Sequence, residues 1–148
     1  MPKIDLDLIP QTNLTGYPAP FDQPVAGRWY RRLSPPSKLS EFGASHVVLK
    51  PGASSSQRHW HDGEDELVIM LSGEAVLIED DAETLMCSGD VAAFPKGVQN
   101  GHHLINRSAA DCVFVAVSGG ECAGGEYSDI DMLFTADGRY VRKDGTAY

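Results

Sequence analysis

Residues 52–73 read GASSSQRHWHDGEDELVIMLSG, and this stretch decides the fold. Successive side chains of a β-strand point to opposite faces, so His59 and His61 face the same way while Trp60 points away. The turn signal DGED follows, and the apolar run LVIML then indicates a returning, neighbouring strand. Glu66 opens that second strand beside the histidines. The stretch therefore predicts two imidazoles and one carboxylate close together, a set of groups that can bind one metal ion.

A second stretch with histidines lies further along the chain. Residues 89–106 read GDVAAFPKGVQNGHHLIN. His102 begins an alternating run in which Leu104 and Asn106 are in phase with it, as expected for a short strand. PKG is a turn signal before this run. We expect His102 to be the fourth group of the same site.

Together the two stretches resemble the two signatures of the cupin superfamily. The first signature has a glycine, His-x-His, a glutamate and, after six residues, another glycine; the second has a glycine, Pro-x-Gly, a histidine and an asparagine. The resemblance is to small, single-domain, metal-binding cupins, including members described as sugar-phosphate isomerase-like. It implies an all-β double-stranded β-helix, the cupin jelly-roll barrel, and one metal ion bound by His59, His61, Glu66 and His102.

The sequence departs from these signatures in two places. The first glycine lies one residue further from the first histidine than usual, which a loop can absorb. Four residues instead of two separate Gly97 from His102, so Asn100 stands where the histidine normally does. Either the turn is longer or the fourth ligand is lost, and the three-residue spacing from His102 to Asn106 favours the longer turn. A register slip of one residue would instead bring in His103, because it exchanges the two faces of a strand.

Length and composition indicate one globular domain. The chain has 148 residues, of which 42% are hydrophobic and 22% are charged, which disfavours a disordered chain or a membrane protein. A net charge of −9 makes non-specific nucleic-acid binding unfavourable. The start MPKIDLDLIP lacks the pattern of a secretory signal. We expect a cytoplasmic protein whose partner is a small-molecule ligand or substrate, with no nucleic acid and no membrane.

Short strand-like runs separated by turns predict the all-β fold. No amphipathic helical stretch interrupts them, which is typical of a sandwich or barrel. The expected strands cover residues 28–33, 43–50, 57–61, 66–71, 74–79, 83–87, 91–94, 102–106 and 112–118.

The chain divides into three expected parts. Residues 1–24 hold five prolines and form an N-terminal arm, and residues 25–118 form the cupin barrel. Residues 119–148 are a glycine-rich connection and a C-terminal tail, which we expect to pack on the barrel or on a partner subunit of a homodimer. Tyr127, Ile130, Met132, Phe134 and Tyr140 are the expected anchors of that tail.

Other side chains have simpler expected roles. The cluster RWYRR at residues 28–32 is interpreted as a strand with its charges on a solvated face. Cys87 and Cys112 lie in apolar runs and are expected to be buried, whereas Cys122 lies among glycines and its role cannot be assigned. No CxxC pair indicates a disulfide framework or a zinc knuckle.

The same phase argument gives expected pocket residues. Gln57 is in phase with His59, so we expect it on the pocket side if the strand is regular that far back. Met70 and Leu104 are the expected apolar lining. We assign no catalytic residue.

The expected cofactor is one divalent transition metal, Fe, Mn, Zn, Ni or Co, because three of the four donors are nitrogen. Such an ion can polarise a carbonyl, stabilise an enediolate or activate dioxygen. We therefore expect a metal-dependent enzyme acting on a small anionic or chelating substrate, as a dioxygenase or other oxidoreductase, or as a sugar or sugar-phosphate isomerase. The alternatives are a non-catalytic, metal-assisted ligand-binding or sensory protein and a structural protein without metal.

Overall fold

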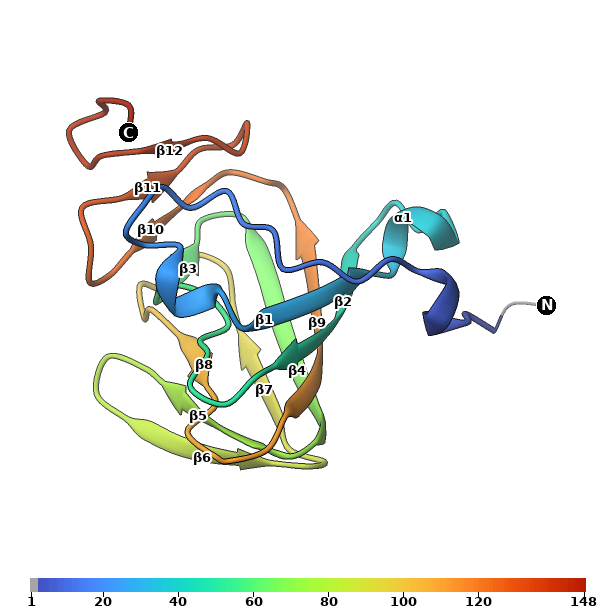
Figure 1. Ribbon diagram of the computed structural model, residues 1–148. Helices are drawn as coiled ribbons and strands as arrows, with labels where there is room; N and C mark the ends of the chain where they lie inside the picture. The colour runs from blue at the N-terminus through green and yellow to red at the C-terminus, as the bar shows by residue number, and fades with distance from the viewer. Residues whose placement is uncertain (1–2) are drawn as a thin grey trace.

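Two β-sheets face each other across the main hydrophobic core (Figure 1). The computed structural model describes residues 3–148. The larger sheet has the strand order β1-β2-β9-β4-β7, and the smaller sheet has the order β6-β5-β8. The strands of the larger sheet are Arg28–Arg32 (β1), Gly43–Leu49 (β2), Glu64–Ser72 (β4), Val91–Phe94 (β7) and Cys112–Gly120 (β9). Those of the smaller sheet are Glu74–Ile78 (β5), Glu83–Cys87 (β6) and His103–Ile105 (β8).

A third sheet covers one end of this structure. It has the order β12-β11-β10-β3 and joins the first histidine strand to the C-terminal tail. The tail strands were not predicted, since each has only two or three residues. The bounds are His59–His61 (β3), Gly125–Tyr127 (β10), Leu133–Phe134 (β11) and Tyr140–Val141 (β12).

Helices are short in the described part of the chain. They are the 3-10 helices Leu6–Leu8 and Gln23–Val25 and the four-residue helix Ser34–Ser37 (α1). None of them has the length or the apolar character to cross a membrane. The predicted all-β class is therefore confirmed. All nine expected strands are present, and their ends differ from the expected ones by at most two residues.

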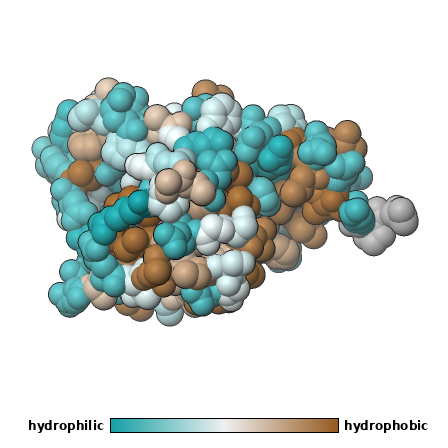
Figure 2. Space-filling view, turned by 60° about the horizontal axis from the view of Figure 1, so that its bottom comes forward, coloured by the Kyte–Doolittle hydropathy of each residue, from teal (hydrophilic) through white to brown (hydrophobic). Residues whose placement is uncertain are grey.

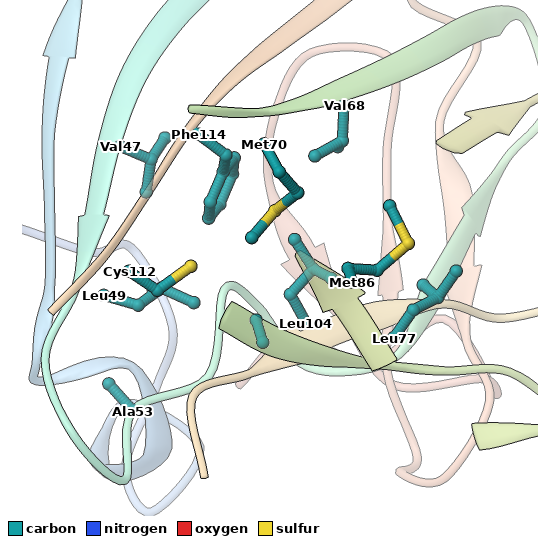
Figure 3. Packing of buried hydrophobic residues seen from close by; sticks show 11 residues of the cluster. Val47, Leu49, Ala53, Val68, Met70, Leu77, Met86, Leu104, Cys112 and Phe114 are labelled. Carbon is teal, nitrogen blue, oxygen red and sulfur yellow. The ribbon is translucent and has the colours of Figure 1, made fainter. Parts of the chain in front are cut away.

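Alternation along the strands places the core side chains. In β4, Val68 and Met70 are buried, while Leu67 and Ile69, which alternate with them, are only half-buried. Figure 3 shows Met70 and Phe114 of the larger sheet pointing toward Leu104 of the smaller one. A fully buried aliphatic side chain stabilises the fold by roughly 1.5–3 kcal/mol relative to an exposed one.

The turn between β4 and β5 requires a glycine. Gly73 has φ +72°, in the left-handed region, and a Cβ atom there would lie 2.5 Å from the carbonyl oxygen of Asp111. Both constraints exclude a larger residue without local rearrangement. The turn keeps the two sheets close at this end of the molecule.

A second hydrophobic cluster lies beneath the arm and the tail. Tyr17 from the N-terminal arm packs against Tyr127 of β10, with ring centroids 5.5 Å apart. Figure 1 shows the arm running across the molecule to these C-terminal strands before it returns to β1. The anchors expected in the tail, Tyr127, Ile130, Met132, Phe134 and Tyr140, all belong to this cluster.

The outer surface corrects one expectation about the cysteines. Cys112 is fully buried as expected, but Cys87 is exposed, because Met86 takes the inward position in β6 and the next side chain points outward. Figure 2, which turns the bottom of Figure 1 toward the viewer, shows hydrophobic residues among hydrophilic ones on this face. Leu71 and Leu85 are also exposed, at 47% and 57%.

Candidate metal centre

The two histidine segments lie side by side. His59 and His61 are on β3, and His59 forms an antiparallel bridge with His102. The backbone N–H of His102 donates to the carbonyl of His59 at 2.9 Å, and the N–H of His59 donates back at 3.2 Å. Glu66, on β4, pairs in register with Phe94 and Ser118 on its two sides. Residues far apart in the sequence are therefore held by regular backbone pairing.

Three of the four side chains expected to bind metal, His59, His61 and Glu66, have ligand atoms within 4.8 Å of one another, and His102 joins them through Glu66. His59 Nε2 lies 3.0 Å from His61 Nε2, and His102 Nε2 lies 3.0 Å from Glu66 Oε2. His61 Nε2 is 3.6 Å from the same Glu66 oxygen. Atoms bound to one transition-metal ion at about 2.0–2.2 Å lie roughly 3 Å from one another. The observed spacings are of that size.

The outer nitrogens of the imidazoles fix their orientation. Nδ1 of His59 is 3.0 Å from the carbonyl of Gln57 and Nδ1 of His102 is 3.5 Å from the carbonyl of Asn100, whereas Nδ1 of His61 has Glu64 Oε2 at 3.5 Å but forms no hydrogen bond with the described residues. An oxygen acceptor at Nδ1 places the proton there and leaves the lone pair on Nε2. Nε2 of His59 and Nε2 of His61 face each other, and Nε2 of His102 faces the Glu66 carboxylate. This donor set fits a divalent transition metal.

The local electrostatics also suit metal binding. Burial lowers the pKa of His59 to about 3. Burial acts in the same direction on His61, but hydrogen bonding and attraction from Glu66 and Glu64 outweigh it and raise the pKa of His61. Burial opposes ionisation of Glu66, but hydrogen bonds from His102 and His61 outweigh it and lower the pKa of Glu66. At neutral pH the site has a neutral His59 and an ionised carboxylate, as metal ligands require.

His102, and not His103, makes contact with the acid of the site. The side chain of His103 does not contact Glu66; its Nδ1 lies 2.9 Å from the carbonyl of Ser56. The side-chain amide of Asn100 donates to Glu79 at 2.9 Å, away from the histidines. The four residues after Gly97 therefore form a longer turn that still delivers His102 to the site.

Aromatic rings support the imidazoles. The ring of Phe94 stacks on His102, with centroids 3.6 Å apart and planes 1° from parallel. Phe134 of β11 lies 5.2 Å from His61, centroid to centroid, and Tyr127 of β10 lies 5.6 Å from His59. The tail thus forms part of the wall behind the histidines. This contribution was not visible in the sequence, because it depends on the pairing of β10 with β3.

The four donors lie on the wall of one cavity between the sheets. Its volume of about 340 Å³ is at the small end of the range for small-molecule sites. Leu104 lines it as expected, but Gln57 and Met70 do not. The Gln57 amide donates to the carbonyl of Phe21 at 2.8 Å, because regular strand structure begins only at His59 and the phase does not extend back to residue 57. Met70 is instead buried in the core.

The cavity also contains residues that the sequence analysis did not assign to it. Arg28, Tyr30 and Arg32 of β1 line it, as does Tyr17 of the N-terminal arm. The expectation that the charges of residues 28–32 all lie on a solvated face is therefore wrong for Arg28, whereas Arg32 lines the cavity and is also exposed. Their period-two spacing was visible, but the sequence does not tell which face of a strand is covered by a second sheet.

Comparison with known proteins identifies the family of this chain. The family model for the Cupin domain matches residues 45–118. A crystal structure from Silicibacter pomeroyi, named as a sugar phosphate isomerase from a cupin superfamily, is 40% identical, with a TM-score of 0.93 over 99% of this chain and 96% of that one. No curated protein matches this chain.

More distant structures share the fold. A predicted oxalate decarboxylase from Thermotoga maritima is 25% identical, with a TM-score of 0.56 over 61% of this chain and 80% of that one. The polyketide cyclase RemF from Streptomyces resistomycificus is 17% identical, with a TM-score of 0.65 over 80% and 79%. These names span different reactions, so the fold alone does not select one.

Proposed function

The chain belongs to the cupin superfamily, and from that premise we propose that it is a metal-dependent enzyme that isomerises a small sugar or sugar phosphate. One observation carries this proposal: His59, His61 and Glu66 bring their ligand atoms within 4.8 Å of one another, with His102 against Glu66, on the wall of a cavity that is otherwise lined by hydroxyls, arginines and apolar groups. The relative from Silicibacter pomeroyi, similar over nearly the whole chain, bears the name of a sugar phosphate isomerase.

In this proposal His59, His61, Glu66 and His102 bind one divalent transition-metal ion, Fe, Mn, Zn, Ni or Co. The donor set of three nitrogens and one oxygen disfavours Mg²⁺ and Ca²⁺, which prefer oxygen ligands. Bound there, the ion would supply a Lewis acid that polarises a substrate carbonyl. Loss of any one donor is then expected to weaken both metal binding and turnover.

The other lining residues suit a small, hydroxylated substrate. Ser45, Ser56 and Ser118 present hydroxyl groups that can exchange hydrogen bonds with a polyol. Phe94 and Phe114 form part of an apolar wall that limits water access. Isomerisation between an aldose and a ketose moves hydrogen between adjacent carbons and between their oxygens. It consumes no oxidant, so the cavity needs no second cofactor.

A dioxygenase is the second candidate function. The apolar part of the cavity, which includes Val68, Leu77, Phe94 and Phe114, supports it, because dioxygen chemistry needs a dry pocket beside an open metal position. A non-catalytic protein in which the metal orients a small carboxylate is the alternative outside enzymes.

Turnover assays separate these functions. We would incubate the protein with a panel of sugar phosphates and follow aldose–ketose exchange and solvent deuterium incorporation by NMR. Metal-dependent exchange without oxygen uptake, abolished in His61→Ala and retained in the exposed variant Leu85→Ala, is the expected result. Iron-dependent oxygen uptake with catechols, thiols or diketones would favour the dioxygenase. Tight carboxylate binding without any turnover would favour the ligand-binding protein.

We also propose that the protein is a homodimer in which a second copy covers the outer face of the larger sheet. Leu67 and Ile69 of β4 and Val115 and Val117 of β9 point to this face, where an antiparallel sheet exposed to water would normally carry polar residues. Size-exclusion chromatography with light scattering should give twice the mass of the chain, and Val115→Lys should give a monomer. A monomeric parent protein would refute this arrangement.

A further inference from the structure

We propose that Arg28 and Arg32 form an anion-binding subsite at the β1 side of the cavity, and that it binds the phosphate group of a phosphomonoester substrate. The assignment of the substrate rests on the proposed function, whereas the binding of the anion can be tested without any turnover. Both arginines line the same cavity as the histidines.

Strand pairing places the two arginines on the inner face of the larger sheet. Arg28 pairs with Leu49, Tyr30 with Val47 and Arg32 with Ser45. Directly paired residues of neighbouring strands lie on the same face of a sheet. Leu49 and Val47 are buried in the core between the sheets, so the side chains of all three β1 residues are directed inward.

Each of the two guanidinium groups contacts the ring of Tyr30, which lies between the arginines in the strand. Arg28 Cζ lies 5.3 Å from the centroid of the Tyr30 ring, and Arg32 Cζ lies 6.0 Å from it. The Tyr30 hydroxyl is itself fixed, since it donates to the carbonyl of Leu14 at 3.0 Å. Arg28 Nη1 donates to the carbonyl of Ser55 at 2.8 Å. Arg28 is thus ordered by a hydrogen bond and by Tyr30, and Arg32 contacts the same ring at the cavity wall.

Arg28 has a donor that is ready for a ligand. Its Nε atom is buried and has no hydrogen-bond partner among the described residues. A buried donor without a partner costs roughly 1–3 kcal/mol, so a bound oxyanion that accepts from it recovers this cost. The fork of Nε and Nη donors matches two oxygens of a phosphate or carboxylate.

The positive charges of Arg28 and Arg32 are not paired with a carboxylate of the described residues. Within residues 3–148, no carboxylate lies within 4.0 Å of a nitrogen of either Arg28 or Arg32. Glu66 is the single acidic residue among those that line the cavity, and it faces the histidines. By contrast, Lys50 and Arg107, near the same sheets, are exposed and paired with Asp111 and Glu83.

The charge of the cavity lining favours an anionic ligand. The whole chain has a net charge of −9, yet the cavity holds two arginines and one carboxylate. Such local inversion of charge draws an anion inward. Two guanidinium groups that line one cavity favour a dianion over a monoanion, which favours a phosphomonoester over a carboxylate.

The subsite and the proposed metal ligands are suitably separated. β2 and β9 lie between β1 and β4, so Arg32 and Glu66 stand three strand spacings apart, each about 4.8 Å. Both groups line one cavity, so a small molecule bound in it can direct its phosphate toward the arginines and its reacting oxygens toward the histidines. The arginines would orient the substrate and would not take part in the chemistry.

Calorimetry with inorganic phosphate tests the subsite. We would titrate phosphate, sulfate and acetate, at mildly alkaline pH, into the protein as purified and after treatment with a chelator. Phosphate should bind more tightly than acetate, with the same affinity after metal removal. Arg28→Gln should weaken phosphate binding about tenfold to a hundredfold, because it removes charge-assisted hydrogen bonds. Arg32→Gln should weaken it less, because that side chain is exposed at the cavity mouth.

The matched control is Arg31→Gln, on the same strand but the opposite face. It removes the same charge and should leave phosphate binding unchanged. Arg28→Lys, which keeps the charge without the fork, should lie between Arg28→Gln and the parent protein and serves as the second variant if Arg28→Gln fails to fold. Absence of phosphate binding, or equal binding in the Arg28 and Arg31 variants, would overturn the proposal.

The two proposals fail in different ways. If His59→Ala abolishes phosphate binding while Arg28→Gln does not, the anion binds at the metal and the subsite is wrong. If phosphate binding depends on Arg28 but no sugar phosphate is turned over, the subsite stands and the isomerase proposal fails.

Discussion

Gly101, the residue before His102, is expected to be intolerant of even one methyl group. A Cβ atom at this position would lie 2.9 Å from the Cβ of Ser128 and 3.3 Å from the Cγ of Arg58. The hydroxyl of Ser128 can rotate away, but its Cβ is attached to a backbone whose N–H donates to the Arg58 carbonyl at 2.9 Å. Overpacking of this kind costs about 1–3 kcal/mol, so Gly101→Ala should destabilise the protein by that amount.

A second substitution shows whether the reason is steric. Ser128→Gly removes the opposing Cβ and should recover most of the stability in the double variant, whereas Ser128→Ala should recover little. Ser128→Gly alone should cost at most about 1 kcal/mol, from added freedom of the unfolded chain. Because the residues are in contact, the two effects should not add.

The assay is urea denaturation of the four proteins, with metal content measured on the same samples. Gly101→Ala should also lower metal content, because the displaced turn carries His102, and the double variant should restore it. A change within 0.5 kcal/mol for Gly101→Ala, or strictly additive effects, would refute the idea that close packing of this turn on the tail positions the histidine.

Three further predictions concern the fold. In the native protein, Cys87 and Cys122 should react with a thiol reagent while Cys112, whose pKa burial raises to about 11, should react only after unfolding; three fast thiols would contradict this. Asn106→Ala should cost about 2–4 kcal/mol in denaturation, because the buried amide donates to two main-chain carbonyls at 2.8 Å; a neutral effect would contradict it. Burial raises the pKa of Tyr17 to about 12. The contribution of Tyr17 to the free energy of unfolding should therefore be fully present below about pH 10 and should fall as the pH rises toward 12. Thermal melts measure this, and a melting temperature that does not change between about pH 10 and 12 would contradict it.

The strands and the histidine pair could be predicted because their signals are local. Alternation of side chains placed His59 and His61 on one face, as observed. The turn signal and apolar run placed Glu66 at the start of the next strand; it lies on that strand beside His61, but the strand begins two residues earlier, at Glu64. The spacing from His102 to Asn106 favoured the longer turn, and the structure brings His102 to Glu66.

What the sequence could not provide depends on contacts between distant segments. Gln57 was placed by extending a strand phase through residues that are irregular in the structure. The inward direction of Arg28 and Arg32 depends on which face of β1 the rest of the barrel covers. Tail strand β10 exists through its pairing with β3, and three residues carry too little periodicity to reveal it.

The central claim is that His59, His61, Glu66 and His102 bind one transition-metal ion. The most direct test is elemental analysis of the protein purified without added metal, alongside His59→Ala, His102→Ala and the neighbouring control His103→Ala. We predict about one equivalent of metal per chain in the parent protein and in His103→Ala, and little in the other two variants. Undiminished metal in His102→Ala, or equal loss in His103→Ala, would contradict the account.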